Sequence, residues 1–454
     1  MKLKTKRNPF NYAFAAFFRH TVNGGMLLMI TAILAMIIAN SPWSQWYLEF
    51  FNYPISLQIG DFNLFSHHGH PLTLSAFIND ALMAIFFFHI GLEVKREILA
   101  GELSTVRKAA LPVLAAVGGM IVPVMIYLAI AHTSPESRGA AIPMATDIAF
   151  SLGVLSLLGK RVPLGLKIFL TAFAVVDDIG GILVIAFFYT TNLEFSYLLI
   201  AAGLLAVLLI ANWRGVVAIP LYIAIGIAIW YLFLQSGIHS TIAGVLVAFT
   251  IPARPKIKIG KYIDRIRNSI ASFPHGRNES IVLTRDQIWE LKNIEAASNN
   301  VISPLQHIED RLHGVVSYFI MPLFAFVNAG IVFSGGINDF LGVVTYAVAL
   351  GLILGKFIGI FSFTWLSVKL KLVSLPERSN WKSIAGIALL SGIGFTVSLF
   401  IANLSFGSDH PELLNQAKLG IVLGTVISGL LGYITLSMVL PKEAKKSEAA
   451  ETNE

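Results

Sequence analysis

Two adjacent aspartates, Asp177 and Asp178, lie in the middle of an apolar run of helical length, Leu164 to Tyr189. In a membrane-spanning helix each central aspartate costs about 2.5 to 3.5 kcal/mol, so the pair costs about 5 to 7 kcal/mol before any compensation. Ionisable groups at such depth are retained where function needs them. The doublet is therefore the first candidate for a functional site.

Helical geometry limits how these two carboxylates can interact. Neighbouring side chains on a helix point about 100° apart, so the pair cannot share one proton face to face. At about 6 Å and an effective dielectric of about 20, the second negative charge costs about 2.8 kcal/mol. One or both groups should hold a proton near neutral pH unless a cation is present, which is the electrostatic basis of proton-for-cation exchange.

One lysine is a candidate counter-charge for the doublet. Lys356 lies inside another apolar stretch, between Gly355 and Gly359. A lone buried lysine loses its proton, whereas a lysine that faces a carboxylate can keep it. The simplest prediction pairs Lys356 with Asp177 or Asp178. The alternative is a side chain that extends to the membrane surface.

A third aspartate lies at an expected helix break. Asp147 follows Pro143 and Thr146 within an apolar segment, where proline interrupts a helix, and a second break is expected at 391–396. Two interrupted spans, one in each half of a chain, indicate the binding site of a transporter. If the breaks cross near the midplane, Asp147 would offset the positive helix N-termini and Lys356 the negative C-termini. The alternative is ordinary packing of glycine-rich helices.

The second predicted span carries further titratable groups. His89, Glu93 and Glu97 recur at intervals of four residues and fall on one helical face, with Arg96 three residues after Glu93. Asp80 lies near the opposite end of the same span. Taken alone, this cluster is more typical of an ordinary charged helix end than of a functional site.

The composition predicts an all-α membrane protein. Hydrophobic residues make up 56% of 454, charged residues 13%, and the mean hydropathy is +0.73. The absence of cysteine excludes disulfides, thiolate metal sites and cysteine nucleophiles. The net charge of +7 fits cytoplasmic loops that face anionic membrane lipid, so no nucleic-acid partner is needed to explain it.

Twelve stretches are long enough to span a bilayer, which places both termini on one side. That side holds 30 of the 33 lysines and arginines, so it is predicted to be cytoplasmic. Spans 3 to 5 and 10 to 12 each have the interrupted helix second of three, which predicts inverted repeats with spans 4 and 11 crossing near the midplane. The stretches are 24–40, 74–95, 109–131, 139–158, 164–189, 196–212, 216–234, 238–252, 315–333, 341–368, 383–404 and 417–440.

Three segments have a character of their own within a single transporter domain that covers 1–454. Residues 53–65 alternate in polarity around a Gly-Asp turn, which predicts an extracytoplasmic β-hairpin that joins two subunits in a homodimer; the alternative is an ordered loop on its own subunit. Residues 253–314 form a cytoplasmic insert with a helical pattern that Thr284 could cap. Residues 441–454 are a polar cytoplasmic tail.

The ordered motifs resemble those of the bacterial Na⁺/H⁺ antiporters of the NhaA type. Asp310 and His89 depart from the family's pattern. The resembling stretches cover nearly every span except the sixth and seventh: IND at 78–80, GLEVKRE at 91–97, AIPMATDIAFSLG at 141–153, VPLGLKIFLTAFAVVDDIGGILVIAFFYT at 162–190, SGIHSTIAGV at 236–245, MPLFAFVNAG at 321–330, GK at 355–356, SGIGFTVSLFIA at 391–402 and HPELLNQAKLG at 410–420.

The resemblance implies a role for each of the chemistry-bearing residues. Asp178, Asp177 and Thr146 form the site for the transported Na⁺ or proton. Lys356 is the proton-coupling group, as the partner of Asp177, and Asp147 belongs with Thr146 at the helix crossing. The remaining implied roles are a cation passage towards the outside, at Asp80, and a pH response, at Glu93, Arg96, Glu97, Glu309 and His313.

The resemblance also implies the activity: a secondary active sodium or lithium/proton antiporter of the bacterial inner membrane, which is not an enzyme and needs no cofactor. Exchange would be electrogenic, about two protons inward per sodium outward, pH-regulated and by alternating access, with Na⁺ and H⁺ competing for the aspartates. From the residues alone, three alternatives remain: another proton-coupled transporter, an intramembrane aspartyl protease that uses Asp147 and Asp177, and a cation channel.

Overall fold

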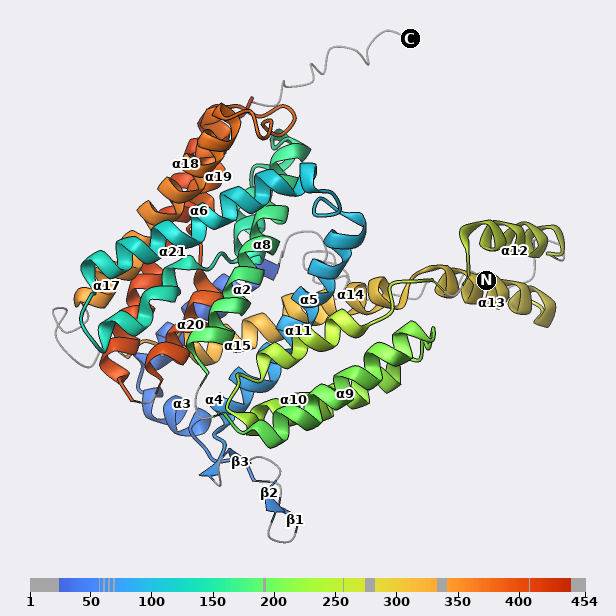
Figure 1. Ribbon diagram of the computed structural model, residues 1–454, viewed down its shortest axis with the longest axis horizontal. Helices are drawn as coiled ribbons and strands as arrows, with labels where there is room; N and C mark the ends of the chain where they lie inside the picture. Colours follow the sequence, from blue (N-terminus) through green and yellow to red (C-terminus); the bar gives the residue numbers. More distant parts are fainter. Residues whose placement is uncertain are drawn as a thin grey trace, which may run out of the picture.

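The computed structural model describes residues 24–441, except 57, 60–61, 64–65, 68–69, 191–192, 256, 274–281, 333–340 and 408. The basic N-terminal segment and nearly all of the predicted 441–454 tail lie outside the described residues. Within them the chain is almost entirely helical (Figure 1).

The helices of the first half follow the apolar stretches of the sequence closely. They are α2 (Gly24–Ala39), α3 (Ser44–Phe51), α4 (Leu74–Phe77), α5 (Met83–Ala100), α6 (Val106–Ile130), α7 (Ile148–Ser156), α8 (Leu164–Phe188), α9 (Phe195–Trp213), α10 (Ile219–Ser236) and α11 (Thr241–Thr250). A π-helical turn, Ile78–Leu82, joins α4 to α5, and 3₁₀ segments cover Glu136–Met144 and Gly159–Arg161.

The second half adds a helical insert and the remaining apolar helices. They are α12 (Ile259–Ala271), α13 (Arg285–Val301), α14 (Pro304–Val315), α15 (Met321–Asn328), α17 (Val343–Leu350), α18 (Lys356–Lys369), α19 (Trp381–Leu390), α20 (Phe395–Phe406) and α21 (Pro411–Val439). π-Helical turns at Val316–Ile320 and Gly351–Gly355 join α14 to α15 and α17 to α18.

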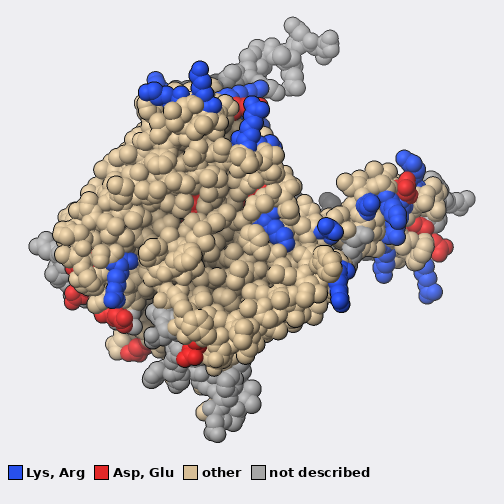
Figure 2. All heavy atoms as spheres, in the orientation of Figure 1, with Lys and Arg blue, Asp and Glu red and all other residues tan. Residues whose placement is uncertain are grey.

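Seven of the described helical segments are long and apolar enough to cross a membrane, and up to ten if each of three bent pairs is one span. The structure is thus that of a helical, multi-span membrane protein. The prediction of twelve spans goes beyond this count and stays a prediction. Most of the face in Figure 2 is uncharged; lysines and arginines gather at its upper edge and on the side towards the insert, and acidic residues gather at its lower edge beside a basic patch.

The largest apolar core joins α6, α8 and α17 to α21, and α2, α5, α7 and α15 complete it. Helices α6 and α18 cross where Gly118 meets Gly359, and a Cβ atom at either glycine would collide with the backbone of the other helix. Small residues let membrane helices approach this closely. This crossing brings Lys356, one turn before Gly359, into the core.

A second core packs α9, α10 and α11 together, with contributions from α14 and from Leu92 of α5. The antiparallel pair of α9 and α10 runs along one side of the molecule in Figure 1. The insert lies apart from both cores: α12 and α13 form a hairpin that projects beyond α14. Thr284 caps α13 in a capping box with Gln287, as the sequence predicts.

The segment predicted as a hairpin contains two short strands. β1 (Gln58–Ile59) pairs antiparallel with β2 (Phe62–Asn63), with Ile59 opposite Phe62. Residues 60 and 61, the predicted turn, lie outside the described residues. A second small pair that the sequence analysis did not predict follows, β3 (Ser66–His67) with β4 (His70–Pro71). The proposed role of this region in a homodimer stays a prediction.

Candidate ion-binding site

Two helix breaks meet in the centre of the larger core. The chain bends by 44° between Glu136–Met144 and α7, and by 45° between α19 and α20. The backbone N–H of Asp147 donates to the carbonyl of Ile393 at 2.7 Å, and the Thr146 hydroxyl donates to the carbonyl of Ser391 at 2.9 Å. These bonds satisfy backbone carbonyls that a break leaves without a helical partner.

The carboxylate of Asp147 serves both helices that begin at this meeting point. Its Oδ1 accepts from the N–H of Phe150 at 3.0 Å, which caps α7. Its Oδ2 accepts from the N–H and the hydroxyl of Thr396 at 3.1 and 2.7 Å, in the first turn of α20. A negative charge at two helix N-termini is favourable because both helix dipoles point their positive ends towards it.

Lys356 pairs with Asp177. Its Nζ lies 2.7 Å from Oδ2 of Asp177, and neither side chain is more than 2% exposed. The ring of Phe173 covers the ammonium group, with 5.6 Å between Nζ and the ring centroid. Among the described residues Lys356 makes no hydrogen bond to the C-terminal carbonyls of the broken helices, so its counter-charge acts on Asp177 instead.

Asp178 points into a cavity of about 310 Å³, away from that ion pair. Asp147, Thr146 and Thr396 line the same cavity, so three oxygen-bearing side chains from both breaks share it with Asp178. The divergence of about 100° between adjacent helical residues explains why one carboxylate meets the lysine and the other meets the cavity.

The other end of this cavity is lined by the charged cluster that the sequence places on the second span. Glu93, Arg96, Glu309 and His313 all line it, together with His89. Arg96 links α5 to α14: its Nε lies 3.0 Å from Oε1 of Glu309, and its Nη2 lies 3.0 Å from Oε1 of Glu97. The structure therefore brings together all five residues of the predicted pH response, with Glu97 joined through Arg96.

Burial raises the pKa of the Glu309 carboxyl to about 7, and the neighbouring acids Glu93, Asp310 and Glu97 raise it further against the opposing charge of Arg96. The ion pair between Arg96 and Glu309 is thus complete only when pH rises above about 7. A charge change near neutral pH at the mouth of the cavity is chemically suited to a pH response.

Asp80 lies apart from the cavity. It belongs to the π-helical turn before α5, and its Oδ1 lies 3.4 Å from the Ser240 hydroxyl and 3.6 Å from Nε2 of His239. The structure thus places it towards the opposite end of α5 from Glu93 and Arg96. Its role in transport stays a prediction.

Sequence reasoning missed Thr396 as a candidate. The predicted break at 391–396 ends on this residue, and its counterpart Thr146 follows the first break in the same way. A comparison of the two breaks could therefore have identified Thr396 from the sequence. Ser398 was also missed; its hydroxyl donates to the carbonyl of Ile142 at 2.8 Å and joins the same two segments.

Apolar helices around two joined breaks, with buried carboxylates and a cavity that reaches them, are typical of secondary transporters. The family described as Na⁺/H⁺ antiporter 1 matches residues 15–436. The chain is 61% identical over 422 residues to a Na⁺/H⁺ antiporter NhaA of Bacteroides fragilis, covering 93% of this chain and 96% of that protein. The chain belongs to this family of antiporters, which are transporters and not enzymes.

Further relatives are matched over nearly their whole length. The Na⁺/H⁺ antiporter NhaA of Phocaeicola vulgatus is 58% identical over 443 residues, 97% of this chain and 99% of that protein. That of Helicobacter pylori is 44% identical over 448 residues, 98% and 100% of the two chains. The likeness therefore covers the helix breaks, the aspartate doublet and Lys356 together.

Proposed function

We propose that this protein exchanges Na⁺ or Li⁺ for protons across the bacterial inner membrane, with Asp178 as the principal cation ligand. The observation that carries the proposal is the split between two neighbouring carboxylates: Asp178 faces the cavity, and Asp177 is held by Lys356. Membership of the antiporter family supports the choice of ions.

The chemistry of the cavity suits a small hard cation. Such cations prefer carboxylate and hydroxyl oxygens, which Asp178 and Thr146 present to the cavity and which Asp177 could add by leaving Lys356. Protons compete for the same carboxylates, so loading with Na⁺ would displace them. The ion pair of Asp177 with Lys356 would open when Asp177 binds a cation, which couples the lysine to proton exchange.

Alternating access is the proposed transport cycle. Six spans, 3 to 5 and 10 to 12, would form the inverted repeats that carry the crossing of spans 4 and 11, within twelve spans in all. With both termini in the cytoplasm, the cavity beside Arg96 and Glu309 opens to the cytoplasmic side. Exchange of about two protons per sodium would move net charge, so the membrane potential would act on it at about 2.3 kcal/mol per charge per 100 mV.

Proton release from proteoliposomes or everted vesicles tests the proposal. Addition of Na⁺ or Li⁺ to the wild type should dissipate a preformed pH gradient, whereas the Asp178→Asn variant should show none of this exchange, because it lacks the charge that binds both ions. The matched control is Asp264→Asn, an exposed acid on α12 that should behave as the wild type. Full activity of Asp178→Asn would overturn the assignment.

The same assay separates the alternatives. A cation channel would pass Na⁺ without coupled protons, and a solute-coupled transporter would respond to its solute and not to Na⁺. An intramembrane protease would cleave a reporter helix and leave the gradient unchanged. Sodium-dependent gradient collapse that depends on Asp178 fits only the antiporter.

A further inference from the structure

Helix α12 carries an apolar stripe that nothing in the described part of the chain covers completely. Four isoleucines follow one another at intervals of four, three and four residues, which places them on one helical face: Ile259, Ile263, Ile266 and Ile270. Ile266 is half-buried, but Ile259, Ile263 and Ile270 are 68%, 48% and 60% exposed. Large apolar side chains exposed together indicate an interaction surface.

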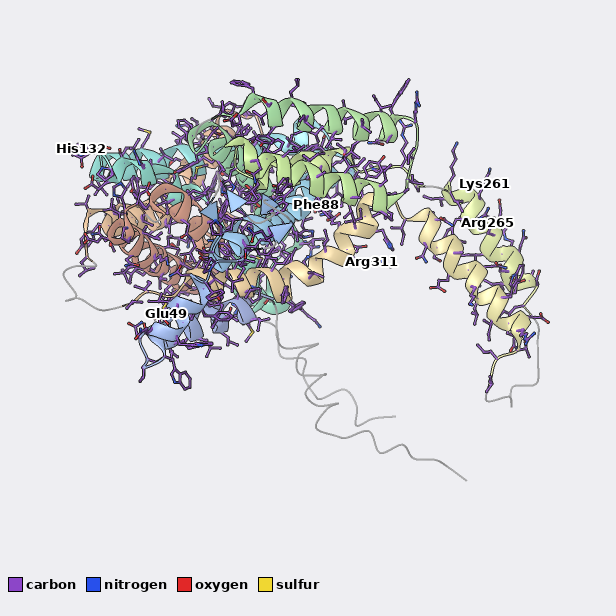
Figure 3. All side chains as sticks on the ribbon, turned by 90° about the horizontal axis from the view of Figure 1, so that it is seen from below. Glu49, Phe88, His132, Lys261, Arg265 and Arg311 are labelled. Carbon is purple, nitrogen blue, oxygen red and sulfur yellow. The ribbon has the colours of Figure 1, made fainter. Side chains whose placement is uncertain are left out.

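Positive charge accompanies the stripe. At 100° per residue Arg267 and Lys258 are the cations nearest its two sides, whereas Lys261 lies on the opposite face. Residues 258–271 carry four cations and a single acid, Asp264, so their net charge is +3; the cations are Lys258, Lys261, Arg265 and Arg267. All four cations are exposed, and no ion pair involves them within the described ranges. Lys261 and Arg265 lie on the part of the hairpin that stands clear of the helical body (Figure 3).

We propose that α12 lies on the anionic lipid of the inner membrane leaflet, with its isoleucine stripe in the boundary between headgroups and acyl chains. Amphipathic helices with basic residues beside an apolar stripe bind such surfaces, because the stripe enters the lipid and the cations pair with anionic headgroups. The insert joins α11 and α14 on the side where positive charge predicts the cytoplasm, so anionic lipid is close to it.

A second copy of this chain fits the surface less well than lipid. Two α12 helices packed through their stripes would bring two sets of cations, each with a net charge of +3, alongside one another. Like charges repel, whereas an anionic lipid surface neutralises both sets. The occupant that matches apolar and charged parts together is therefore the lipid surface.

The absence of cysteine from this chain makes the test direct, because one introduced cysteine can carry a polarity-sensitive fluorophore on the full-length protein. We expect a label at Ile263→Cys to shift to shorter wavelength, and to be quenched by nitroxide lipid, in vesicles that contain phosphatidylglycerol but not in purely zwitterionic vesicles. Asn268→Cys, on the opposite face of α12, is the control and should show neither effect.

Two further measurements complete the test. Raising the salt from 0.1 to 1 M shortens the screening length from about 10 to 3 Å. The changes Lys258→Gln and Arg267→Gln remove the cations nearest the stripe. Each treatment should reduce the lipid-dependent signal severalfold. Identical signals from Ile263→Cys in the two kinds of vesicle would overturn the proposal. A signal that follows protein density instead of lipid charge would also overturn it, in favour of a second copy.

An independent observation concerns three asparagines that join separate spans. Nδ2 of Asn403 in α20 donates to Oδ1 of Asn328 at 3.0 Å, and Nδ2 of Asn328 donates to Oδ1 of Asn79 at 2.7 Å. Nδ2 of Asn79 donates back to Asn328 at 3.2 Å. This amide cluster therefore bridges α20, which begins at the Asp147 crossing, to α15 and to the turn before α5.

The three helical segments that carry these asparagines each run from the cavity to the amide cluster. In α20, Thr396 lines the cavity and Asn403 lies seven residues, about 10 Å, further on. Between these levels the ring of Phe400 contacts Phe87 of α5 and Phe324 of α15, with centroids 5.7 and 6.4 Å apart. Resting on the proposed alternating access, we infer that the amide cluster is a latch that holds the far side closed while the cavity is open.

Thiol accessibility tests the latch without any measurement of transport. Leu399→Cys lies one turn from Asn403 towards the cavity and is fully buried. In intact cells a charged, impermeant thiol reagent should modify it slowly, and severalfold faster when Asn403→Ala or Asn328→Ala is added. Unchanged rates in both variants would overturn the latch. Failure of antiport itself would show in the Asp178 assay and not here.

Discussion

At the scale of single residues, the order of two aspartates along one helix decides which partner each can meet. Asp177 is buried against Lys356, and Asp178 faces the cavity. A buried ion pair is held in place less by its own net stability than by the penalty for breaking it, because a lone buried charge costs several kcal/mol. Substitution of one partner should therefore lower the free energy of unfolding much more than substitution of both partners.

We expect Asp177→Asn to lower the melting temperature strongly, since it leaves Lys356 buried without a counter-charge, at a cost of about 3 to 5 kcal/mol. Adding Lys356→Met, which fills a similar volume without charge, should recover most of the loss. A thiol-reactive dye cannot report unfolding because the chain has no cysteine, so the fluorescence of its seven tryptophans is the suitable probe. A double variant no more stable than Asp177→Asn would contradict the expectation.

The residues alone predicted which side chains carry the chemistry, but not the partner towards which each side chain points. The pairing of Lys356 with one member of the doublet followed from charge alone, and the choice of Asp177 followed only from the family resemblance. Its physical cause is the way α6, α8 and α18 pack. The role of Thr396 was not predicted because threonines in helices commonly bond their own backbone, as Thr171 does with Lys167. Only the arrangement of the second break turns Thr396 towards Asp147.

At the scale of elements, glycine contacts set the position of Lys356. A Cβ atom at Gly359 would collide with the carbonyl of Gly118, which neither backbone can avoid without moving. We expect Gly359→Ala to separate α6 from α18, to lower the melting temperature and to reduce exchange at least tenfold by displacing Lys356.

Gly203→Ala in α9 is the matched control for that change. Its new Cβ would meet nothing within 4 Å, and alanine is favoured over glycine in a helix by up to about 1 kcal/mol. This variant should be as stable as the wild type or slightly more stable, with unchanged exchange. Equal effects of the two substitutions would show that helix propensity, and not the crossing, determines the result.

The contact between α5 and α14 should make stability depend on pH. The pKa of Glu309 rises from 4.5 to about 7 on folding, so the folded state holds this proton more tightly than the unfolded state. Its contribution to stability is therefore fully present below pH 4.5 and is lost as pH rises through about 7. In Glu309→Gln this part of the pH dependence should disappear.

Melting temperatures measured in steps between pH 4.5 and 7.5 would check this. The wild type should lose more stability than Glu309→Gln over that interval, and Asp286→Asn, at an exposed position of α13, should follow the wild type. Parallel curves for wild type and Glu309→Gln would contradict the assigned shift.

Elements that are determined by neighbouring residues in the sequence were predictable, whereas elements that depend on packing against distant parts of the chain were not. The capping box of Thr284 and Gln287 lies within four residues of sequence, so the start of α13 could be read directly. The π-helical turn before Lys356 has no such local signal, since Gly351–Gly355 reads as continuous helix. The β3–β4 pair was missed because its two-residue strands are too short for a pattern of alternation.

At the scale of the whole molecule, charge on loops predicts the orientation in the membrane. An impermeant maleimide should label Arg267→Cys on the insert only in everted vesicles, and Glu49→Cys on α3 only in intact cells. Both residues are exposed, and Glu49 lies at the opposite end of the molecule from the insert in Figure 3. Labelling of both cysteines from one side would contradict the predicted topology, and the reverse of the expected pattern would place the cavity on the outer face.

The double capping by Asp147 has a mechanical consequence for the whole molecule. The carboxylate of Asp147 accepts hydrogen bonds from the first turns of both α7 and α20. If either helix moved alone, at least one of these capping bonds would break. We therefore expect α7 and α20 to move together as one rigid unit. Large movements during transport would then occur where this unit contacts α5 and α15, and the arrangement of side chains around Asp147 would stay the same.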